Sequence, residues 1–594
     1  MQPDRLRHDL PGRAGAGPGP VPGLPATRDS KGRAACFGGR AGDDRARLRP
    51  VRGCLRRGMW DRPGRGTASP GPRASLRDRE SPAPRVPQLA EVQERASCVR
   101  RRVGPRSAAL ARGADDVTAP GAQMLAGLRR LEDLPSWLLQ DRLEREMRQC
   151  IPEFASGEKK LLEARAKRIQ LGAASATGWF VATFQGHANT PTTVHMTGAV
   201  DPGRCAGIDA VCSGVPFGEA GWRCALPELG LVLETLPPQS GLRAQPILTD
   251  ATRARTILEQ GMRAGSPALA DIRIERCTPS VARSTFNRCT VVYRLEYGPE
   301  AAGRDWPQVV VAKTDRGNKG SAAYRAMCAL WCSPLRWSGA VTIAEPLGFL
   351  PEPNVLIQRA VPGENTLGDR IERMLLCDPG ELEERENIRD LLGKTARGLA
   401  ALHGCGLQGP PFGWEEEMAD VREIMERLAY WVPGLEAELA PTLAGLDEFA
   451  IHHPPQDPVP SHRSFRPAQV LVHEGHIAFI DFDGFCEAEP AADLAMFRAS
   501  MKQKLIHAAE RADHRGSALL WAQARLPRLD ELSELFLEEY ERTASVSRER
   551  VALWETLYLV RYVLNTWERV RPEHIENSMG ILEHHVRQGR LPLM

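Results

Sequence analysis

Three stretches of the sequence decide the expected fold: Val459-Pro-Ser-His-Arg-Ser-Phe-Arg-Pro-Ala-Gln-Val-Leu-Val472, Ile480-Asp-Phe-Asp-Gly-Phe485 and Glu489-Pro-Ala-Ala-Asp-Leu-Ala495. The apolar runs 470–472 and 476–480 are short and strand-like, and they predict a β-hairpin. A hairpin brings its two ends together, so the side chains of Gln469 and Asp481 should lie close to each other.

The expected pair of Gln469 and Asp481 has the chemistry of a magnesium site. Mg²⁺ prefers one or two carboxylates, completed by phosphate oxygens and water molecules. The alternative is structural, because aspartate is common at strand ends and in turns, where its side chain bonds the local backbone. The flanking pattern favours the metal-binding interpretation.

The three stretches resemble the catalytic and metal-binding segments of the aminoglycoside phosphotransferase family, within the protein-kinase-like superfamily. That family shows His-Gly/Arg-Asp, then Asn or Gln five residues after the Asp, then Ile-Asp-Phe, then Asp-Pro-x-x-Asp-Leu-Ala. The resemblance covers residues 270–590 and implies a bilobal fold. It also implies transfer of a phosphoryl group from ATP, with Mg²⁺, to a small-molecule hydroxyl.

The sequence departs from the family at the catalytic position, where Ser464 replaces the expected aspartate. A serine hydroxyl cannot accept a proton at neutral pH without an activator. Three groups could compensate: Asp483, His462 acting across the loop, or an acid supplied by the substrate. The loss need not abolish activity, since positioning and electrostatics provide much of the catalysis of phosphoryl transfer.

Several residues of the preceding strands are candidates for nucleotide binding. Lys313 closes the apolar run that starts at Val309, and a kinase lysine at such a place contacts the α- and β-phosphates. A solvated lysine is the alternative, and the helix that follows at 319–332 offers no glutamate partner. The glycine-free turn at 280–288 contains Arg283, which either donates to phosphate or belongs to an ordinary polar turn.

The stretch 356–363 resembles the hinge between kinase lobes, where Gln358 and Ala360 would lie near the adenine ring. Asp493 should have a structural role, because the family uses it to hold the backbone of the catalytic loop. His403 is also expected to be structural. Arg463 and Arg466 are either surface arginines or binding groups for an anion.

The charge of the chain is divided unevenly along its 594 residues. Residues 1–120 carry a net charge of +13, whereas the remainder carries −10, for a total of +3. A uniformly basic nucleic-acid-binding protein is therefore excluded. The first 123 residues are rich in Arg, Pro and Gly and poor in aromatic residues, so a disordered arm is predicted. A basic arm that binds nucleic acid is the weaker alternative.

The order of the expected elements indicates an α+β architecture with a bilobal protein-kinase-like fold. After the arm we expect an N-terminal α/β region at 124–265, which we interpret as a degenerate duplicate of the kinase N-lobe. The N-lobe itself is expected at 266–362 and a helical C-lobe at 363–594. The expected strands of the N-lobe include 272–277, 290–295 and 309–313.

Other features suggest a reduced cytoplasmic protein. The N-terminus has no apolar signal segment, no long uncharged run could span a membrane, and the 14 cysteines form no C-x-x-C pair. Two functions therefore compete. The first is an ATP-dependent phosphotransferase acting on a small molecule, and the second is a catalytically impaired pseudokinase that binds nucleotide or acts as a scaffold.

Overall fold

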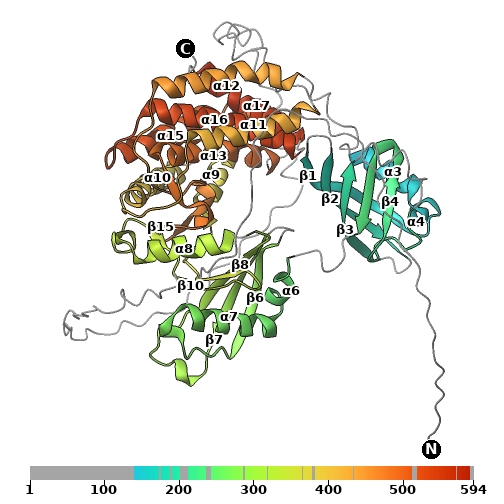
Figure 1. Ribbon diagram of the computed structural model, residues 1–594, viewed down its shortest axis with the longest axis horizontal. Helices are drawn as coiled ribbons and strands as arrows, with labels where there is room; N and C mark the ends of the chain where they lie inside the picture. Colours follow the sequence, from blue (N-terminus) through green and yellow to red (C-terminus); the bar gives the residue numbers. More distant parts are fainter. Residues whose placement is uncertain are drawn as a thin grey trace, which may run out of the picture. The chain divides into compact units, whose positions relative to one another are not determined.

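The computed structural model describes residues 140–588, apart from 173–174, 187–189, 201–211, 236–241, 285–287, 318, 364, 378–381, 432–433, 512–517 and 570–571 (Figure 1). The expected arm at 1–123 and the first part of the expected α/β region at 124–265 lie outside these residues. The α+β class is confirmed: strand-rich regions come first and a helical lobe follows.

The first described region is an antiparallel sheet with two short helices before it. The helices are α3 (Gln140–Cys150) and α4 (Pro152–Ala155). The strands are β1 (Lys160–Leu171), β2 (Ala176–Gln185), β3 (Pro191–Val200), β4 (Arg223–Leu226) and β5 (Leu231–Thr235), in the spatial order β1-β2-β3-β5-β4. Alternate residues of β3 are buried, with Val194 and Met196 packed into the core and His195 between them exposed. One face of the sheet thus carries the apolar side chains.

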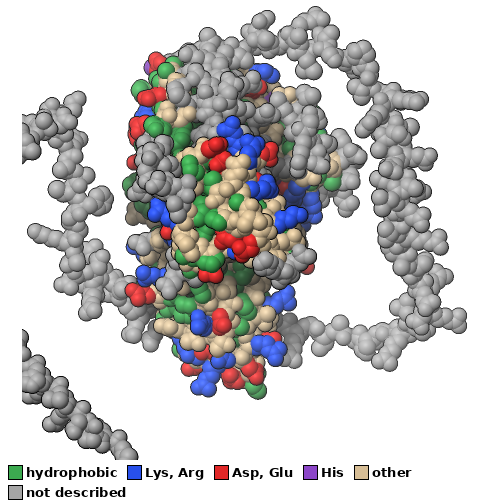
Figure 2. Space-filling model, turned by 90° about the vertical axis from the view of Figure 1, so that its right-hand side faces the viewer, with side chains coloured by type: hydrophobic (Ala, Val, Ile, Leu, Met, Phe, Trp, Pro, Cys, Tyr) green, Lys and Arg blue, Asp and Glu red, His purple; other side chains and the backbone are tan. Residues whose placement is uncertain are grey.

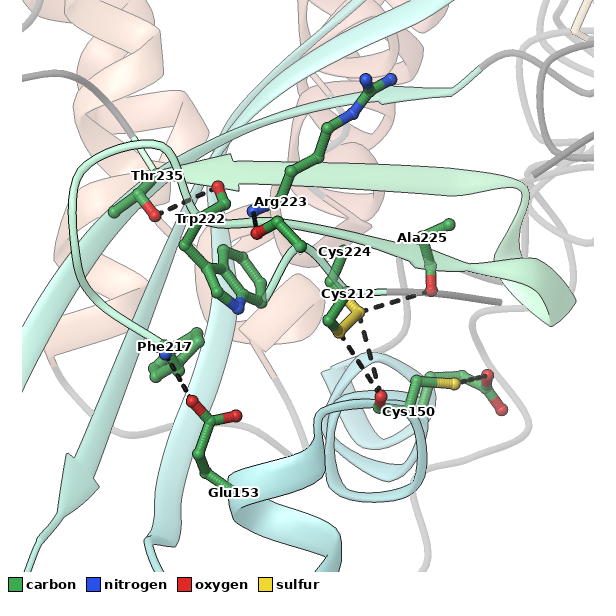
Figure 3. Close-up of a disulfide and its surroundings, with 11 residues drawn as sticks. Cys150, Glu153, Cys212, Phe217, Trp222, Arg223, Cys224, Ala225 and Thr235 are labelled. Carbon is green, nitrogen blue, oxygen red and sulfur yellow. Dashed lines mark hydrogen bonds between the residues drawn. A yellow bond between two sulfur atoms is a disulfide. The ribbon is translucent and has the colours of Figure 1, made fainter. Parts of the chain in front are cut away.

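A disulfide joins Cys212 to Cys224 beside this sheet, as Figure 3 shows. The Sγ atom of Cys212 lies 3.5 Å from the carbonyl oxygen of Cys150 at the end of α3. Nearby, Glu153 accepts a hydrogen bond from the backbone amide of Phe217. The expectation of reduced cysteines throughout is thus wrong at this pair, whose Cα atoms lie 4.0 Å apart.

The second sheet, with its helices, forms what we call the N-lobe. Its helices are α6 (Gln245–Leu248), α7 (Ala251–Gly265) and α8 (Lys319–Cys332). Its strands are β6 (Arg276–Ser284), β7 (Arg288–Glu296), β8 (Val309–Asp315), β10 (Pro346–Leu350) and β11 (Val355–Arg359), in the order β10-β11-β8-β7-β6. Helix α8 coincides with the expected helix at 319–332, and strands β7 and β8 contain the expected runs.

The first strand of the N-lobe lies later in the chain than the sequence predicts. The apolar pattern favoured 272–277, where Ile272 and Ile274 are indeed buried. The structure instead places β6 at Arg276–Ser284, where the residues from Val281 onward are exposed. Strand β6 is an edge strand held by backbone pairing with β7, so its side chains need not alternate between apolar and polar. The search for apolar alternation in the sequence therefore missed it.

The two sheets share one connectivity. When the strands of each sheet are numbered in chain order, both sheets have the spatial order 1-2-3-5-4 with antiparallel pairing throughout. This agreement fits the expected duplication of the N-lobe. The duplication and the proposed domain boundaries stay predictions.

The C-lobe follows and is mostly helical. Its helices are α9 (Leu367–Leu376), α10 (Leu382–His403), α11 (Trp414–Ala429), α12 (Leu435–His452), α13 (Pro490–Arg511), α14 (Ala518–Gln523), α15 (Leu526–Glu541), α16 (Arg548–Glu568) and α17 (Pro572–Arg587). Its short strands are β12 (Asn365–Thr366), β13 (Val459–Ser461), β14 (Val470–His473), β15 (His476–Phe479) and β16 (Cys486–Ala488); β9 (Thr342–Ile343) pairs with β15. Helices α13 and α16 pack against each other in the core.

The predicted hairpin is confirmed as β14 and β15. Its register pairs His473 with His476, which leaves the two-residue turn Glu474-Gly475. Both turn residues have positive φ, 48° and 77°, as a tight hairpin turn requires. This turn fixes the register, so the two ends of the hairpin meet at Gln469 and Ile480.

A group of buried charges lies between α13, α15 and α16. Glu555 accepts hydrogen bonds from Arg498 at 2.7 Å and from Lys502 at 2.6 Å, and Lys502 also contacts Asp530 at 3.2 Å. Glu555 and Lys502 are almost fully buried. Burial alone would raise the pKa of Glu555, but Arg498 and Lys502 outweigh it and hold the pKa below its usual range.

The surface of the described residues carries both signs of charge. On the face that Figure 2 shows, basic and acidic side chains are interspersed with apolar and neutral ones. Among the helices of the described part of the chain, none has the length and apolar character needed to cross a membrane.

We predict that Glu555→Gln destabilises the C-lobe strongly, because it leaves two buried cations short of a counter-charge. The free energy of unfolding should fall by about 3–5 kcal/mol, measured by urea denaturation. The exposed Glu531 on α15 provides a matched control, and Glu531→Gln should change stability by about 0.5 kcal/mol or less. Equal unfolding midpoints for the two variants would contradict the prediction.

Candidate functional site

Strand β8 has one face in the core and one face that is only half-buried. Val310 and Ala312 are fully buried in the core cluster that contains Leu258 of α7. Lys313 and Asp315 are half-buried. Lys313 and Asp315 are two residues apart, so they point to the same side of the sheet, away from α7.

The register of the N-lobe sheet places Arg283 on the same face as Lys313. Thr290 of β7 pairs with Arg283 on one side and with Lys313 on the other. Directly paired residues share a face, so both basic side chains project from one side, with their Cα atoms about 10 Å apart across two strand spacings. Ser284 accepts a hydrogen bond from Gln245, and Thr285 lies outside the described residues.

Strand β11 and the segment after it contain the expected hinge residues. Gln358 pairs with Val311, two residues before Lys313, so its side chain also belongs to this face; it is buried. The amide of Ala360 donates to the carbonyl oxygen of Val309 at 3.0 Å. That amide is therefore already used within the N-lobe.

On the C-lobe side, Asp481 lies just after β15 in a left-handed backbone conformation, with φ of 73°. This conformation is uncommon for a residue with a side chain. Asp481 precedes the short 3₁₀ turn Phe482–Gly484, which contains Asp483. Phe482 is buried, so it anchors the turn between the two carboxylates.

Four charged side chains from the two lobes meet at one place, which we call the charge cluster: Lys313, Arg288, Asp481 and Asp483. Lys313 Nζ donates to Asp481 Oδ1 at 3.3 Å. Arg288 Nη2 donates to Asp483 Oδ2 at 2.7 Å, and Arg288 Nη1 lies 3.5 Å from Asp481 Oδ2. The structure thus brings together Lys313 and Asp481, which are 168 positions apart in the chain.

The charge cluster shifts the two carboxylates in opposite directions. Burial alone would raise the pKa of Asp481, but the charges of Lys313 and Arg288 lower it to about 2. Burial and then the negative charge of Asp481 raise the pKa of Asp483. The two carboxylates are thus electrostatically distinct, although only one residue separates them.

Arg288 is the residue that sequence reasoning missed. It appears in the sequence only as the last residue of a polar turn, where an arginine carries no particular signal. Its role depends on the register of β7, which pairs Arg288 with Asp315 and so places both on the face of Lys313. A correct assignment of β6 and β7 would have been needed to find it.

Gln469 lies at the start of the hairpin, as expected, and the amide of Ile480 donates to its backbone carbonyl at 3.1 Å. Its side chain is buried, and Oε1 accepts a hydrogen bond from Arg466 Nε at 3.2 Å. The other arginine of this loop, Arg463, stacks its guanidinium 3.9 Å from the ring centre of Phe412.

Ser464, where the resemblance described above implies a catalytic aspartate, faces His462. Ser464 Oγ lies 3.5 Å from His462 Nδ1, and His462 Nε2 lies 3.0 Å from the carbonyl oxygen of Ile480. A carbonyl oxygen only accepts hydrogen bonds, so Nε2 must carry the proton. In the neutral ring, Nδ1 is then the acceptor that faces Ser464.

The loop with His462 is held by Asp493, as the sequence predicts. Asp493 Oδ2 accepts a hydrogen bond from the backbone amide of His462 at 2.6 Å, and it lies 3.3 Å from His403 Nε2. His403 Nδ1 in turn contacts the hydroxyl of Tyr540 at 2.7 Å. Asp493 is fully buried, so this hydrogen-bond network fixes the loop against the core of the C-lobe.

Solved structures resembling the chain share little sequence with it. A choline kinase from Cryptosporidium parvum is 11% identical, over 57% of this chain and 98% of that one, with a TM-score of 0.39. A glucosamine kinase in complex with glucosamine, ADP and inorganic phosphate is 15% identical, over 72% and 93%, with a TM-score of 0.36. These likenesses say nothing about the substrate of this chain.

The GDP complex of an aminoglycoside 2′-phosphotransferase is also similar, with 15% identity over 56% of this chain and 96% of that one and a TM-score of 0.34. A search of curated protein sequences gives no significant match. Residues 342–532, which include Ser464, Gln469 and Asp481, match the model of the phosphotransferase enzyme family. This segment, about a third of the chain, is therefore similar to the phosphotransferase enzyme family.

Proposed function

We propose that the chain binds ATP between its N-lobe and C-lobe and transfers a phosphoryl group to the hydroxyl of a small molecule. One observation carries this proposal: Lys313 of β8 meets Asp481 across the two lobes at 3.3 Å. A lysine at the end of a half-buried strand and a carboxylate opposite it are the parts that phosphoryl-transfer sites use to hold a triphosphate.

The nucleotide would lie against the half-buried face of the N-lobe sheet. The adenine ring would lie beside Gln358 and the backbone that follows it, including Ala360. The phosphates would extend along the same face toward Lys313, with Arg283 two strands away. Basic side chains are suited to this position, because the non-bridging oxygens of the phosphate chain carry negative charge and accept hydrogen bonds.

The arrangement of Ser464 and His462 supports a path for the proton of the acceptor hydroxyl. In the proposed step, the acceptor oxygen forms the new bond to the γ-phosphorus and the bond to the β-bridging oxygen breaks, which releases ADP. The acceptor proton passes to Ser464 Oγ while the serine proton passes to His462 Nδ1. Of the three compensating groups, His462 is the best placed, because Asp483 is bonded to Arg288.

Magnesium at Asp481 and Gln469 stays a prediction, and in the structure the oxygens expected to hold it contact basic side chains. Lys313 and Arg288 would neutralise part of the charge of the phosphates. The partner of the site is a small-molecule alcohol of unassigned structure. A cytoplasmic location and weak nucleic-acid binding by residues 1–123 stay predictions.

A second candidate function is a pseudokinase that binds nucleotide without turnover. Ser464 favours it, since its hydroxyl lies 3.5 Å from His462 Nδ1, which is at the outer limit of a hydrogen bond. The closed charge cluster also favours it, because both carboxylates already have counter-charges. Measurement of turnover separates the two functions.

We predict that ATP raises the melting temperature of the full chain, since a ligand that binds only the native state stabilises it by mass action. Lys313→Ala should remove most of the shift. Lys160, exposed at the start of β1, gives a matched control, and Lys160→Ala should shift as the wild type does. The proposed function fails if ATP shifts the wild type neither with nor without Mg²⁺.

We predict that Ser464→Asp increases the rate of ADP release with water as the acceptor, by about 10²-fold or more, since it restores a direct base. Ser464→Asn is the control, because it has a similar size without a basic oxygen. Turnover by the wild type and its increase in the Asp variant support the phosphotransferase. Turnover in the Asp variant alone identifies a pseudokinase, and equal rates for the Asp and Asn variants contradict the role assigned to position 464.

A further inference from the structure

The carboxylates of the C-lobe already contact cations of the protein itself. Asp481 and Asp483 contribute two negative charges, and Lys313 and Arg288 contribute two positive charges at 2.7–3.5 Å. Arg288 bridges the two carboxylates, so its guanidinium occupies one oxygen of each. A guanidinium does not lose its proton in proteins, so this positive charge is permanent.

The residues present do not fit a divalent metal ion in this arrangement. Both oxygens of Asp481 are engaged, Oδ1 by Lys313 and Oδ2 by Arg288, and Asp483 Oδ2 binds Arg288. Gln469 Oε1, the other expected ligand, accepts from Arg466. Mg²⁺ requires oxygen ligands at about 2.0–2.1 Å in octahedral geometry, so a metal ion at Asp481 would have to displace Lys313 or Arg288 from its carboxylate.

We propose that Arg288 takes the place of the divalent ion, so that the site binds a nucleoside di- or triphosphate without metal. This inference rests on the proposed function, because it concerns the same cleft. The guanidinium is planar and carries five N–H donors, a geometry that can contact carboxylate and phosphate oxygens together. Arg288 comes from β7, whose register places it on the face of Lys313, so both cations approach the phosphates from one lobe.

The position of Arg288 is built into the fold. Cys289, the next residue, is fully buried in the N-lobe core, so the backbone from which Arg288 projects is fixed. The side chain of Arg288 is 28% exposed, and those of Asp481 and Asp483 are 22% and 20% exposed. The ion pairs therefore lie partly out of water, where screening by salt is weaker than at the surface.

The test measures ATP binding by the full chain with isothermal titration calorimetry, in excess EDTA and in excess Mg²⁺. The wild type should bind ATP with similar affinity in both buffers. Arg288→Ala should lose about tenfold or more of the affinity in EDTA, since it removes a charged hydrogen-bond donor. The same variant should bind more tightly when Mg²⁺ is added, because the carboxylate oxygens have then been released.

Two further variants make the result specific. Arg288→Lys keeps the positive charge and should retain part of the binding in EDTA, while losing the bidentate geometry. Arg294 is an exposed arginine on the same strand, and Arg294→Ala should bind ATP as the wild type does in both buffers. Melting curves without ligand identify any variant that does not fold. If Arg288→Ala does not fold, the affinity of Arg288→Lys for ATP in EDTA decides the test.

The outcomes distinguish this inference from the proposed function. Wild-type binding that requires Mg²⁺ would overturn the inference and leave the proposed function standing. Arg288→Ala and Arg288→Lys variants that both bind as the wild type does in EDTA would also overturn it. An absence of ATP binding by the wild type in both buffers would overturn the inference and the proposed function together.

Discussion

The pairing of two carboxylates of the C-lobe with two cations of the N-lobe joins the two lobes at the candidate site. Asp481 and Asp483 lie on one short turn, and burying two like charges side by side is costly unless cations compensate them. Lys313 and Arg288 provide this compensation from neighbouring strands of one sheet. The opposite shifts of the two carboxyl pKa values follow directly from that arrangement. The chemistry of the site is therefore a property of both lobes together.

Each member of the cluster depends on a separate element of the fold. Lys313 and Arg288 share a face because Arg288 pairs with Asp315, which lies two residues after Lys313 on β8. Asp481 is placed by the hairpin before it, whose register follows from the turn Glu474-Gly475. The loop with His462 is held from the core by Asp493. Local choices of turn, strand pairing and buried hydrogen bond thus converge on one position.

Motifs in the sequence predicted the C-lobe site better than the N-lobe site. The hairpin followed from the spacing of its two apolar runs, and the support from Asp493 followed from the family resemblance. Arg288 could not be found in this way, because its contacts with Asp481 and Asp483 join residues 193 and 195 positions apart. The edge strand β6 lacks apolar alternation, so the register that places Arg288 was hidden as well. The disulfide between Cys212 and Cys224 was missed for a similar reason, since spacing alone does not reveal which cysteines meet.

The cation and carboxylate positions have a mechanical consequence, because one kind of charge lies on each lobe. The ion pairs attract the two lobes toward each other. Under the proposed function, an incoming phosphate chain competes with the carboxylates for the same two cations.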